Sequence, residues 1–387
     1  MIKKIAILGS TGSIGKNLIR ILKKDKKNFK IVLLTAEKNY QELSKQAKFF
    51  KVKNLIITNK KSYIKLKKQK FHHKVNIFND FYSLQKIFKK KIDYSMSAIS
   101  GINGLYPTLS IIKYTQLIAI ANKESIICGW NILNNELKRN RTKFVPVDSE
   151  HFSIYYALKN NSVDNIENLY LTASGGPFLK TPLNKLKNIK ISDTLKHPNW
   201  QMGKKISVDS ATLMNKVFEI IEAKKIFNMH YKNIKIIIHP KSYVHALLKF
   251  RDGMIKIIAH DTNMIIPIHN TLYNKEKKFI KTNQLDFNRL SRLNFQRVNI
   301  KKFPLVKIIS KLPSKDSLFE TVIVSTNDEF VKKFLNKEFE FTKLAEKIYS
   351  FINLKEFVKY KSIKPHKIET IEKLNQYVRF KINNMSV

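Results

Sequence analysis

Hydrophobic and polar positions follow two different patterns along the chain, and the first pattern indicates strands separated by helices. The apolar run Lys4–Leu8 is followed by apolar residues at helical spacing between Leu18 and Leu22. Three further strand-like runs follow, with helical patterns between them: Lys30–Thr35, Asn54–Thr58 and Leu117–Ala121. Strands that alternate with helices are typical of a sheet covered on both faces. We therefore expect residues 1–150 to form a doubly wound, Rossmann-like α/β domain.

After about residue 150 the pattern changes to strands around one long helix, Ala211–Phe227. The expected strands are Glu167–Ala173, Ile234–Ile238, Val244–Phe250 and Ile255–His260. These runs predict an α+β domain with a mostly antiparallel sheet at residues 151–274. A polar connector follows at 275–300. Residues 301–387 have helical periodicity and predict a C-terminal bundle of three or four helices.

Composition excludes several classes of protein. The chain has 387 residues, of which 43% are hydrophobic, and this content is typical of a globular protein. Its one cysteine, Cys128, cannot form an intrachain disulfide, which favours a reducing compartment. The apolar runs are too short to span a bilayer, and residues 1–10 lack the cleavage pattern of a signal peptide. We therefore expect a cytoplasmic protein that is not bound to a membrane.

The net charge of +44 raises the question of nucleic-acid binding. Most of the positive charge is Lys, whereas the recognition of bases favours Arg. The Lys residues are also spread over the whole chain beside abundant Ile and Asn, which indicates a coding bias and charges on solvated faces. We expect no nucleic-acid partner; a basic nucleic-acid-binding protein stays as an alternative, and a steep salt dependence of binding would reveal it.

Glycine is scarce, and its clustering is therefore informative. The chain has 10 Gly, where average usage predicts about 27. Gly9, Gly12 and Gly15 lie within seven residues, directly after a strand and at the start of a helix. This arrangement is typical of a turn that admits a dinucleotide pyrophosphate to a helix N-terminus. Glu37 after the second strand favours the ribose of NAD, while Lys38 could pair with the 2′-phosphate of NADP, so spacing leaves the dinucleotide open.

Two acidic side chains follow the extended segment before residue 148. Asp148 and Glu150 are two positions apart and would project together from an extended chain. Paired carboxylates repel unless a cation or a proton intervenes. Oxygen ligands favour Mg²⁺ or Mn²⁺. The alternative is that Asp148 and Glu150 are two surface acids that bind no metal ion.

The helix after Ser210 has an apolar face and a polar face. Asn215, Lys216 and Glu219 share the polar face, which in most helices is simply solvated. The preceding segment 204–210 places hydroxyl groups and cations near the start of this helix, where an anion is favoured.

Two loops could also serve a ligand. Thr172–Pro177 contains adjacent glycines that can aim backbone N–H groups at an anion, although a plain turn explains them equally well. His197–Gly203 carries one large aromatic side chain, Trp200, as mobile lids often do, and an exposed Trp can also merely anchor a loop.

Together these motifs closely resemble the 1-deoxy-D-xylulose 5-phosphate reductoisomerase family of the non-mevalonate isoprenoid pathway. The matching stretches, in order, are GSTGSIG (9–15), ANKES (121–125), PVDSEH (146–151), SGGPF (174–178), HPNW with MG and KISVDSAT (197–212), and MNK with E (214–219). The resemblance covers residues 1 to about 270 and continues more loosely into the helical C-terminal part.

The resemblance implies NADPH-dependent rearrangement and reduction of 1-deoxy-D-xylulose 5-phosphate to 2-C-methyl-D-erythritol 4-phosphate by a homodimer, with Mg²⁺ or Mn²⁺ bound. It implies metal ligands at Asp148, Glu150 and Glu219. It implies cofactor contacts at Thr11, Gly12, Ser13, Ile14, Lys38, Asn39, Asn122, Glu124 and Gly203. It implies substrate contacts at Lys123, Ser149, Glu150, Ser174, His197, Trp200, Ser210, Asn215, Lys216 and Glu219. Among these, Lys123, Glu150 and His197 would be catalytic.

The chain departs from the family pattern at three places. Glu37 stands where the family has a small residue, which bears on the preference for NADPH. Val217-Phe218 replaces Gly-Leu before Glu219, and Ser325–Glu329 matches only in outline. The alternative function is another metal-assisted NAD(P)-dependent dehydrogenase of a small phosphorylated substrate.

Overall fold

The computed structural model describes residues 2–273 and 278–385, whose contacts cluster into two compact units. Unit 1 consists of Met1–Ser125, Ile132–Asp148 and Met264–Ile280. Unit 2 consists of Ile126–Asn131, Ser149–Asn263 and Lys281–Val387. Short 3₁₀ helices occur in both: η1 (Lys26–Asn28), η2 (Ile102–Gly104), η3 (Val163–Asn165), η4 (Leu183–Asn188), η5 (Tyr231–Asn233), η6 (Pro304–Lys311) and η7 (Lys359–Ser362).

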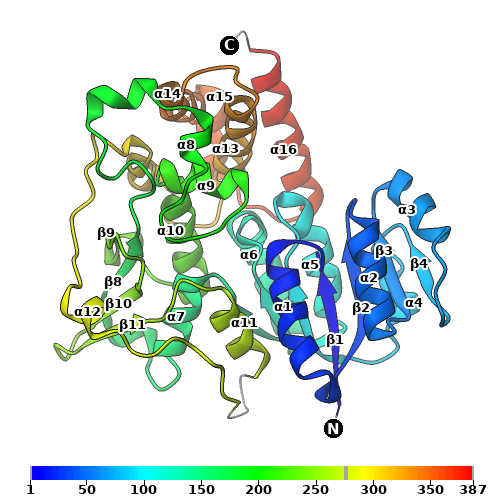
Figure 1. Ribbon diagram of the computed structural model, residues 1–387. Coiled ribbons are helices and arrows are strands. Elements are labelled where there is room, and N and C mark those ends of the chain that lie inside the picture. Colours follow the sequence, from blue (N-terminus) through cyan, green and yellow to red (C-terminus); the bar gives the residue numbers. More distant parts are fainter. Residues whose placement is uncertain (1, 274–277, 386–387) are drawn as a thin grey trace. The chain divides into compact units, whose positions relative to one another are not determined.

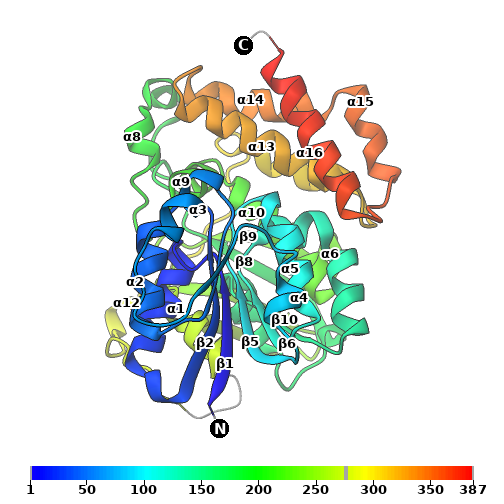
Figure 2. The same cartoon turned by 90° about the vertical axis from the view of Figure 1, so that its right-hand side faces the viewer.

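Unit 1 is built on a parallel sheet with the strand order β4-β3-β2-β1-β5-β6-β7. Its strands are β1 (Lys3–Leu8), β2 (Phe29–Ala36), β3 (Asn54–Ile57), β4 (Asn76–Phe78), β5 (Ile92–Ser97), β6 (Thr115–Ile120) and β7 (Lys143–Pro146). Its helices are α1 (Ser13–Lys24), α2 (Tyr40–Phe50), α3 (Lys60–Lys67), α4 (Leu84–Ile87), α5 (Leu105–Ile112), α6 (Lys123–Arg139) and α11 (Ile265–Leu272). Figure 2 shows α1 and α2 beside β1 and β2, and α5 and α6 on the opposite side. The expected Rossmann-like domain is confirmed.

The central strand explains why this unit folds as it does. Ile5, Ala6, Ile7 and Leu8 in β1 are all fully buried, as a strand covered on both faces requires. The apolar face of α1 packs against this sheet. Helix α11 joins the same core although it follows much later in the chain, and its Thr271 hydroxyl lies 2.9 Å from the Tyr94 hydroxyl of β5.

Unit 2 contains a four-stranded sheet with the order β11-β10-β8-β9. Its strands are β8 (Ile166–Ala173), β9 (Ile234–Ile238), β10 (Val244–Phe250) and β11 (Ile255–Ala259). Strand β10 is antiparallel to β8 and β11, but β8 and β9 are parallel. The expected mostly antiparallel sheet is therefore wrong: the sheet is mixed. The long helical connection between β8 and β9 is a crossover, and a crossover is what joins parallel strands.

Helices cover this sheet and form the C-terminal part of unit 2. They are α7 (Ser149–Ala157), α8 (Ile191–Thr194), α9 (Lys204–Ala211), α10 (Met214–Phe227), α12 (Phe287–Ser291), α13 (Phe319–Leu335), α14 (Phe341–Ile352), α15 (Lys355–Val358) and α16 (Ile368–Asn383). Helices α7 and α10 pack against the strands (Figure 1), and α13 packs against α14 and α16 (Figure 2). The expected helical C-terminal region is confirmed. Within the described ranges, none of the helices is long and apolar enough to cross a bilayer.

The expected long helix at 211–227 is in fact interrupted. Helix α9 ends at Ala211 and α10 begins at Met214, because Leu213 adopts the left-handed conformation with φ +59°. Helical periodicity does not reveal this break, since the apolar pattern continues across it. The two segments can therefore point in different directions.

Candidate active site

Helix α10 presents a polar face that is buried and not solvated. Lys216 is 5% exposed and Glu219 is 1% exposed, while Asn215 is partly buried and donates to the Glu219 carboxylate. Burying ionised groups is costly unless they are paired. The solvated-face alternative is thereby excluded, and the buried charges mark a candidate site.

The buried charges form a compact ion cluster. The Lys216 Nζ lies 2.6 Å from Glu150 Oε1 and 2.6 Å from Glu219 Oε2. Burial lowers the pKa of Lys216, but the charges of Glu150 and Glu219 outweigh burial, so the net pKa lies above the ordinary value. Ser149 donates from its hydroxyl to the Glu150 carboxylate. One ammonium thus stands between two carboxylates, where a cation is electrostatically favoured.

Asp148 completes a set of three carboxylates. Asp148 directly precedes Ser149, the first residue of α7. Glu150 therefore lies in the first turn of this helix and not in the extended segment that we expected. The ligand atoms of Asp148, Glu150 and Glu219 all lie within 4.8 Å of one another. The Lys123 Nζ lies 3.1 Å from Asp148 Oδ2. Three carboxylate oxygens fit the ligand preference of Mg²⁺ or Mn²⁺.

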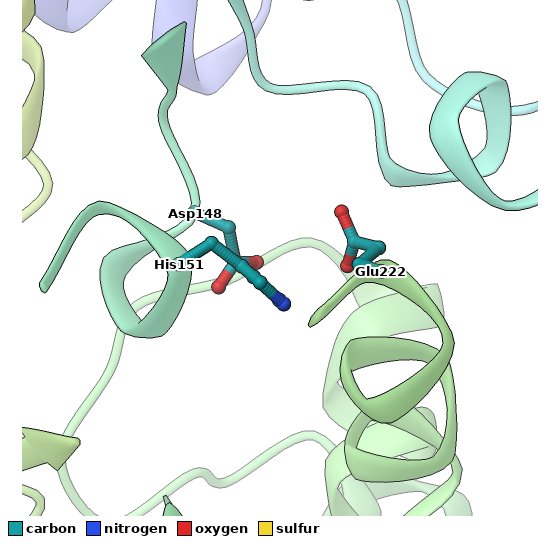
Figure 3. Close-up of side chains that lie close together, drawn as sticks. All are labelled: Asp148, His151 and Glu222. Atoms are coloured by element: carbon teal, nitrogen blue, oxygen red, sulfur yellow. The ribbon is translucent and has the colours of Figure 1, made fainter. Parts of the chain in front are cut away.

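A second group shares Asp148 with this set. The side chains of Asp148, His151 and Glu222 also place ligand atoms within 4.8 Å of one another (Figure 3). The His151 Nε2 lies 2.9 Å from the backbone oxygen of Glu219, and its ring stacks on Phe227. Sequence reasoning did not assign a role to His151 or Glu222; the position of His151 directly after the acidic pair was the available signal.

A glycine turn follows β8 at residues 174–176. Gly175 and Gly176 both have positive φ values, +82° and +66°. A Cβ on Gly176 would lie 2.8 Å from the backbone oxygen of Ser210 at the end of α9. Only glycine therefore lets the turn approach Ser210, and this approach brings Ser174 and Ser210 into one neighbourhood.

His197 lies in the loop between α8 and α9 and bonds to the glycine turn. Its Nδ1 accepts from the backbone N–H groups of Asn199 at 3.1 Å and Trp200 at 3.0 Å. The hydrogen therefore sits on Nε2, which lies 3.0 Å from Ser174 Oγ. Burial and, to a lesser extent, the positive charge of Lys216 lower the pKa of His197 to about 4. His197 is thus neutral near pH 7.

Trp200 in the same loop makes an edge contact with the ring of His245, at 6.1 Å between centroids. His245 in turn stacks on His260 at 3.7 Å. Gly203 is the N-cap of α9, and a Cβ there would meet nothing within 4 Å. The loop therefore rests on an aromatic platform that the sequence pattern did not reveal.

In unit 1 the glycine loop after β1 is built for close backbone approach. A Cβ on Gly9 would lie 2.6 Å from the Ala98 oxygen, and a Cβ on Gly15 would lie 2.4 Å from the Gly9 oxygen. Gly12 is the N-cap of α1 and offers no side chain to cap the helix. The first N–H groups of α1 can therefore serve an anion. The expected contacts Thr11, Ser13 and Ile14 all lie in this loop or in the first turn of α1.

The other expected cofactor residues lie at two more strand ends of unit 1. Glu37 and Lys38 follow β2 and form an exposed pair with 3.2 Å between their charged atoms. Asn39 caps α2 by accepting from the Glu42 N–H. Asn122 caps α6 and donates to the backbone oxygens of residues 99 and 101. Glu124, in the first turn of α6, is buried.

Three family models match the chain. Residues 5–129 match 1-deoxy-D-xylulose 5-phosphate reductoisomerase, residues 144–227 match the C-terminal domain of that enzyme, and residues 261–381 match the DXP reductoisomerase C-terminal domain.

Relatives and solved structures agree with these models. The 1-deoxy-D-xylulose 5-phosphate reductoisomerase of Pelagibacter ubique (strain HTCC1062) is 56% identical over 387 residues and 100% of both chains. That of Sulfurihydrogenibium sp. (strain YO3AOP1) is 36% identical over 93% of both. The Zymomonas mobilis enzyme in complex with NADPH has a TM-score of 0.87 at 27% identity, covering 98% of each chain. DOX-P reductoisomerase with NADPH, fosmidomycin and magnesium has a TM-score of 0.90 at 28% identity, covering 99% of this chain and 98% of the other.

Proposed function

Since the chain belongs to the 1-deoxy-D-xylulose 5-phosphate reductoisomerase family, we propose that it converts 1-deoxy-D-xylulose 5-phosphate to 2-C-methyl-D-erythritol 4-phosphate. The reaction uses NADPH and a divalent metal ion, as the related structures with NADPH and magnesium support. The observation that carries this function is the carboxylate set Asp148, Glu150 and Glu219, of which Glu219 is buried and the other two are partly buried, beside a serine and histidine cluster. The alternative, another dehydrogenase of the same fold, is not favoured by any of these matches.

The three carboxylates hold the metal ion in this proposal. Bound there, the ion supplies Lewis-acid stabilisation of negative charge on the substrate oxygens, which is worth several kcal/mol. Lys216 contributes an ammonium with three N–H donors, of which two point to Glu150 and Glu219. Its third donor is available to a substrate oxygen. Lys123 pairs with Asp148 and orients that carboxylate.

The substrate phosphate binds at the glycine turn and the ends of α9 and α10. Ser174 Oγ accepts from His197 Nε2 and from the Gly176 N–H, both at 3.0 Å. Its own hydrogen is therefore free to be donated to a phosphate oxygen. Ser210, Asn215 and Lys216 complete the set, with Ser149 beside the metal ligands. Trp200 covers the substrate when the loop 197–203 closes, and closure excludes water from the reaction.

NADPH binds at the glycine loop of unit 1, and it supplies the hydride. The glycine loop, in which Gly9 and Gly15 let backbone segments pack closer than a Cβ would allow, supports this assignment, as do the N–H groups of the first turn of α1. Lys38 and Asn39 contact the adenosine phosphate, and Asn122, Glu124 and Gly203 are further contacts in the proposal.

The decisive experiment mixes purified protein, 1-deoxy-D-xylulose 5-phosphate, Mg²⁺ and NADPH, and follows NADPH absorbance with and without a chelator. We expect oxidation that stops on chelation and resumes when Mg²⁺ is restored. No oxidation by folded protein, with NADH also tried, would overturn the substrate assignment and leave the dinucleotide fold standing.

We also propose a cytoplasmic homodimer. Strand β11 is an edge strand whose outward Ile255 and Ile257 are 57% and 46% exposed. Exposed apolar edge strands pair readily with a second copy, and light scattering of the purified protein tests this.

We further propose four parts along the chain: an NADPH-binding domain (1–150), a catalytic domain with the metal and substrate sites and the lid loop (151–274), a connector (275–300) and a C-terminal helical domain (301–387). The order of the three family matches supports this sequence of parts. Residues 274–277 of this division lie outside the described residues.

A further inference from the structure

Ser325–Glu329 in helix α13 is a polar segment without a role in the proposed site. Ser325, Thr326 and Asn327 are fully buried, and Glu329 is 1% exposed. Polar groups with so little exposure require hydrogen-bond partners inside the protein. Glu329 pairs with Lys332 of α13 itself, and the other partners of this segment come from two further helices of unit 2, α9 and α16.

The contact to α9 joins Asn327 to Asp209. The Asn327 Nδ2 donates to Asp209 Oδ1 at 2.8 Å, and the bond is fully buried. Asp209 is itself only 2% exposed, and its other oxygen lies 3.3 Å from the Lys205 Nζ. Burying an isolated carboxylate costs free energy. The Asn327 amide and the Lys205 ammonium offset this cost for Asp209.

The contacts continue from α9 into α16. The Lys205 Nζ also lies 2.9 Å from Asp328 Oδ1. Arg379 in α16 reaches both Asp328, at 3.2 Å, and Glu329, at 2.8 Å. The C-terminal helix is thus connected to α9 by a continuous series of salt bridges.

Helix α9 depends on such outside support. It has only eight residues, and the left-handed Leu213 separates it from α10. A helix of two turns does not fix its own direction in water. Ser210, the residue after Asp209, lies against the glycine turn, where a Cβ on Gly176 would come within 2.8 Å of its backbone oxygen.

We propose that Asp209 and Asn327 are positioning residues for phosphate binding: their hydrogen bond fixes helix α9 so that Ser210 faces the substrate phosphate beside Ser174. Neither residue touches the substrate. The C-terminal helices α13 and α16 therefore determine how well the enzyme holds a phosphorylated sugar. This inference rests on the proposed function, since it concerns the phosphate of that substrate.

The test compares the Asn327→Ala variant with the wild-type protein on two substrates. One is 1-deoxy-D-xylulose 5-phosphate; the other is 1-deoxy-D-xylulose without its phosphate, assayed with and without added phosphite dianion. We expect KM for the phosphorylated substrate to rise roughly tenfold, the size of one lost hydrogen bond to a charged group. Activation by phosphite should fall in proportion, while turnover of the sugar alone without phosphite stays within about twofold.

A charge swap supplies the rescue. In Asp209→Asn/Asn327→Asp the amide and the carboxylate exchange places, so one buried bond is restored with reversed polarity. We expect this double variant to recover a good part of the lost phosphite activation. Recovery would not occur if each residue acted alone.

The matched control is Glu320→Gln. Glu320 lies on the same helix α13, is equally buried, and pairs with Lys225 at 3.2 Å without contacting α9. Loss of stability without loss of phosphite activation is expected there. If Glu320→Gln and Asn327→Ala raise KM equally, the effect is general destabilisation and the proposal fails.

Two further outcomes are distinguishable. If Asn327→Ala does not fold, Asp209→Asn weakens the same hydrogen bond more gently, because a neutral amide oxygen replaces the charged acceptor, and should produce a smaller loss of the same kind; unchanged phosphite activation in that variant overturns the proposal. If the unchanged protein does not turn over the phosphorylated substrate at all, the proposed function fails and not merely this inference.

Discussion

The two candidate ligand sites of this protein differ in the groups that form them, which are backbone groups in one site and charged side chains in the other. The glycine loop of unit 1 is made from backbone, with residues 9–15 following one another along the chain. The carboxylate site is made from side chains of residues 148–150 and 215–219, of which Lys216 and Glu219 are buried. A backbone site depends on the absence of side chains, whereas a side-chain site depends on the balance of its charges. The first should therefore break by steric overlap and the second by loss of charge.

Removing one charge from the carboxylate site should give the largest effect. In Glu219→Gln the shape is kept but the anion is lost, so the set Asp148, Glu150 and Glu219 can no longer hold a divalent cation well. We expect turnover to fall by about 10³-fold or more. NADPH affinity, measured by fluorescence titration, should be unchanged.

The exposed pair of Lys343 and Glu346 offers a control, since its charged atoms lie 3.1 Å apart on the surface. Glu346→Gln should leave turnover as it was. Near-native turnover in Glu219→Gln would remove the metal assignment.

Adding one methyl group to the glycine loop should give the next largest effect. Gly9→Ala places a Cβ 2.6 Å from the Ala98 oxygen at φ +80°. The left-handed conformation costs about 1–2 kcal/mol and the overlap about 1–3 kcal/mol more. We expect NADPH affinity and the melting temperature both to fall.

Gly101→Ala separates these two causes. Gly101 has a similar φ of +77°, but a Cβ there would meet nothing within 4 Å. Its loss of stability should reflect the conformation alone and be smaller. Equal losses in the two variants would contradict the steric account of the loop.

Changing Glu37 should alter cofactor selectivity by a smaller amount. Glu37 pairs with Lys38 at 3.2 Å, and its carboxylate stands where ribose hydroxyls are commonly bound. We expect Glu37→Ser to free Lys38 and to raise the ratio of kcat/KM for NADPH over NADH several-fold, about the worth of one exposed ion pair. Lys38→Ser should lower the same ratio; a ratio that neither variant moves would place the selectivity elsewhere.

The smallest expected effect concerns pH. The pKa of His197 lies at about 4, below the ordinary 6.5 of an unfolded chain. Unfolded protein therefore binds more protons between these values, and stability falls as pH drops from about 6.5 towards 4. We expect NMR to show His197 as the Nε2–H tautomer and neutral above pH 5. His197→Gln should lessen the decline in stability over this window, which urea unfolding can measure.

The sequence predicted the backbone site more completely than the side-chain site. Gly9, Gly12 and Gly15 are adjacent in sequence and in space, so their spacing carries nearly all the information. The strands β1, β2 and β3 were likewise predicted close to their observed bounds, because their apolar runs are continuous. Strands β4 and β5 were missed, since each is short or interrupted by polar residues.

The side-chain site was predicted through its residues but not through its geometry. Asp148 and Glu150 were expected to converge from an extended segment, yet Glu150 lies in the first turn of α7. His151 and Glu222 were given no role, because the only local signal was the position of His151 directly after the acidic pair, and the approach of two helices is not visible in either helix alone. The bond between Asp209 and Asn327 joins residues 118 positions apart, and no local pattern can predict such a contact.

Leu213 has a geometric consequence for the residues on either side of it. On one continuous helix, Ser210 and Asn215 would be rotated apart by roughly 140°, at about 100° per residue. They could not then both face a single small ligand. The left-handed residue removes this fixed angle, so the directions of the two side chains become independent of their separation in the chain. One strained dihedral thus permits two helices in immediate succession to be aimed separately.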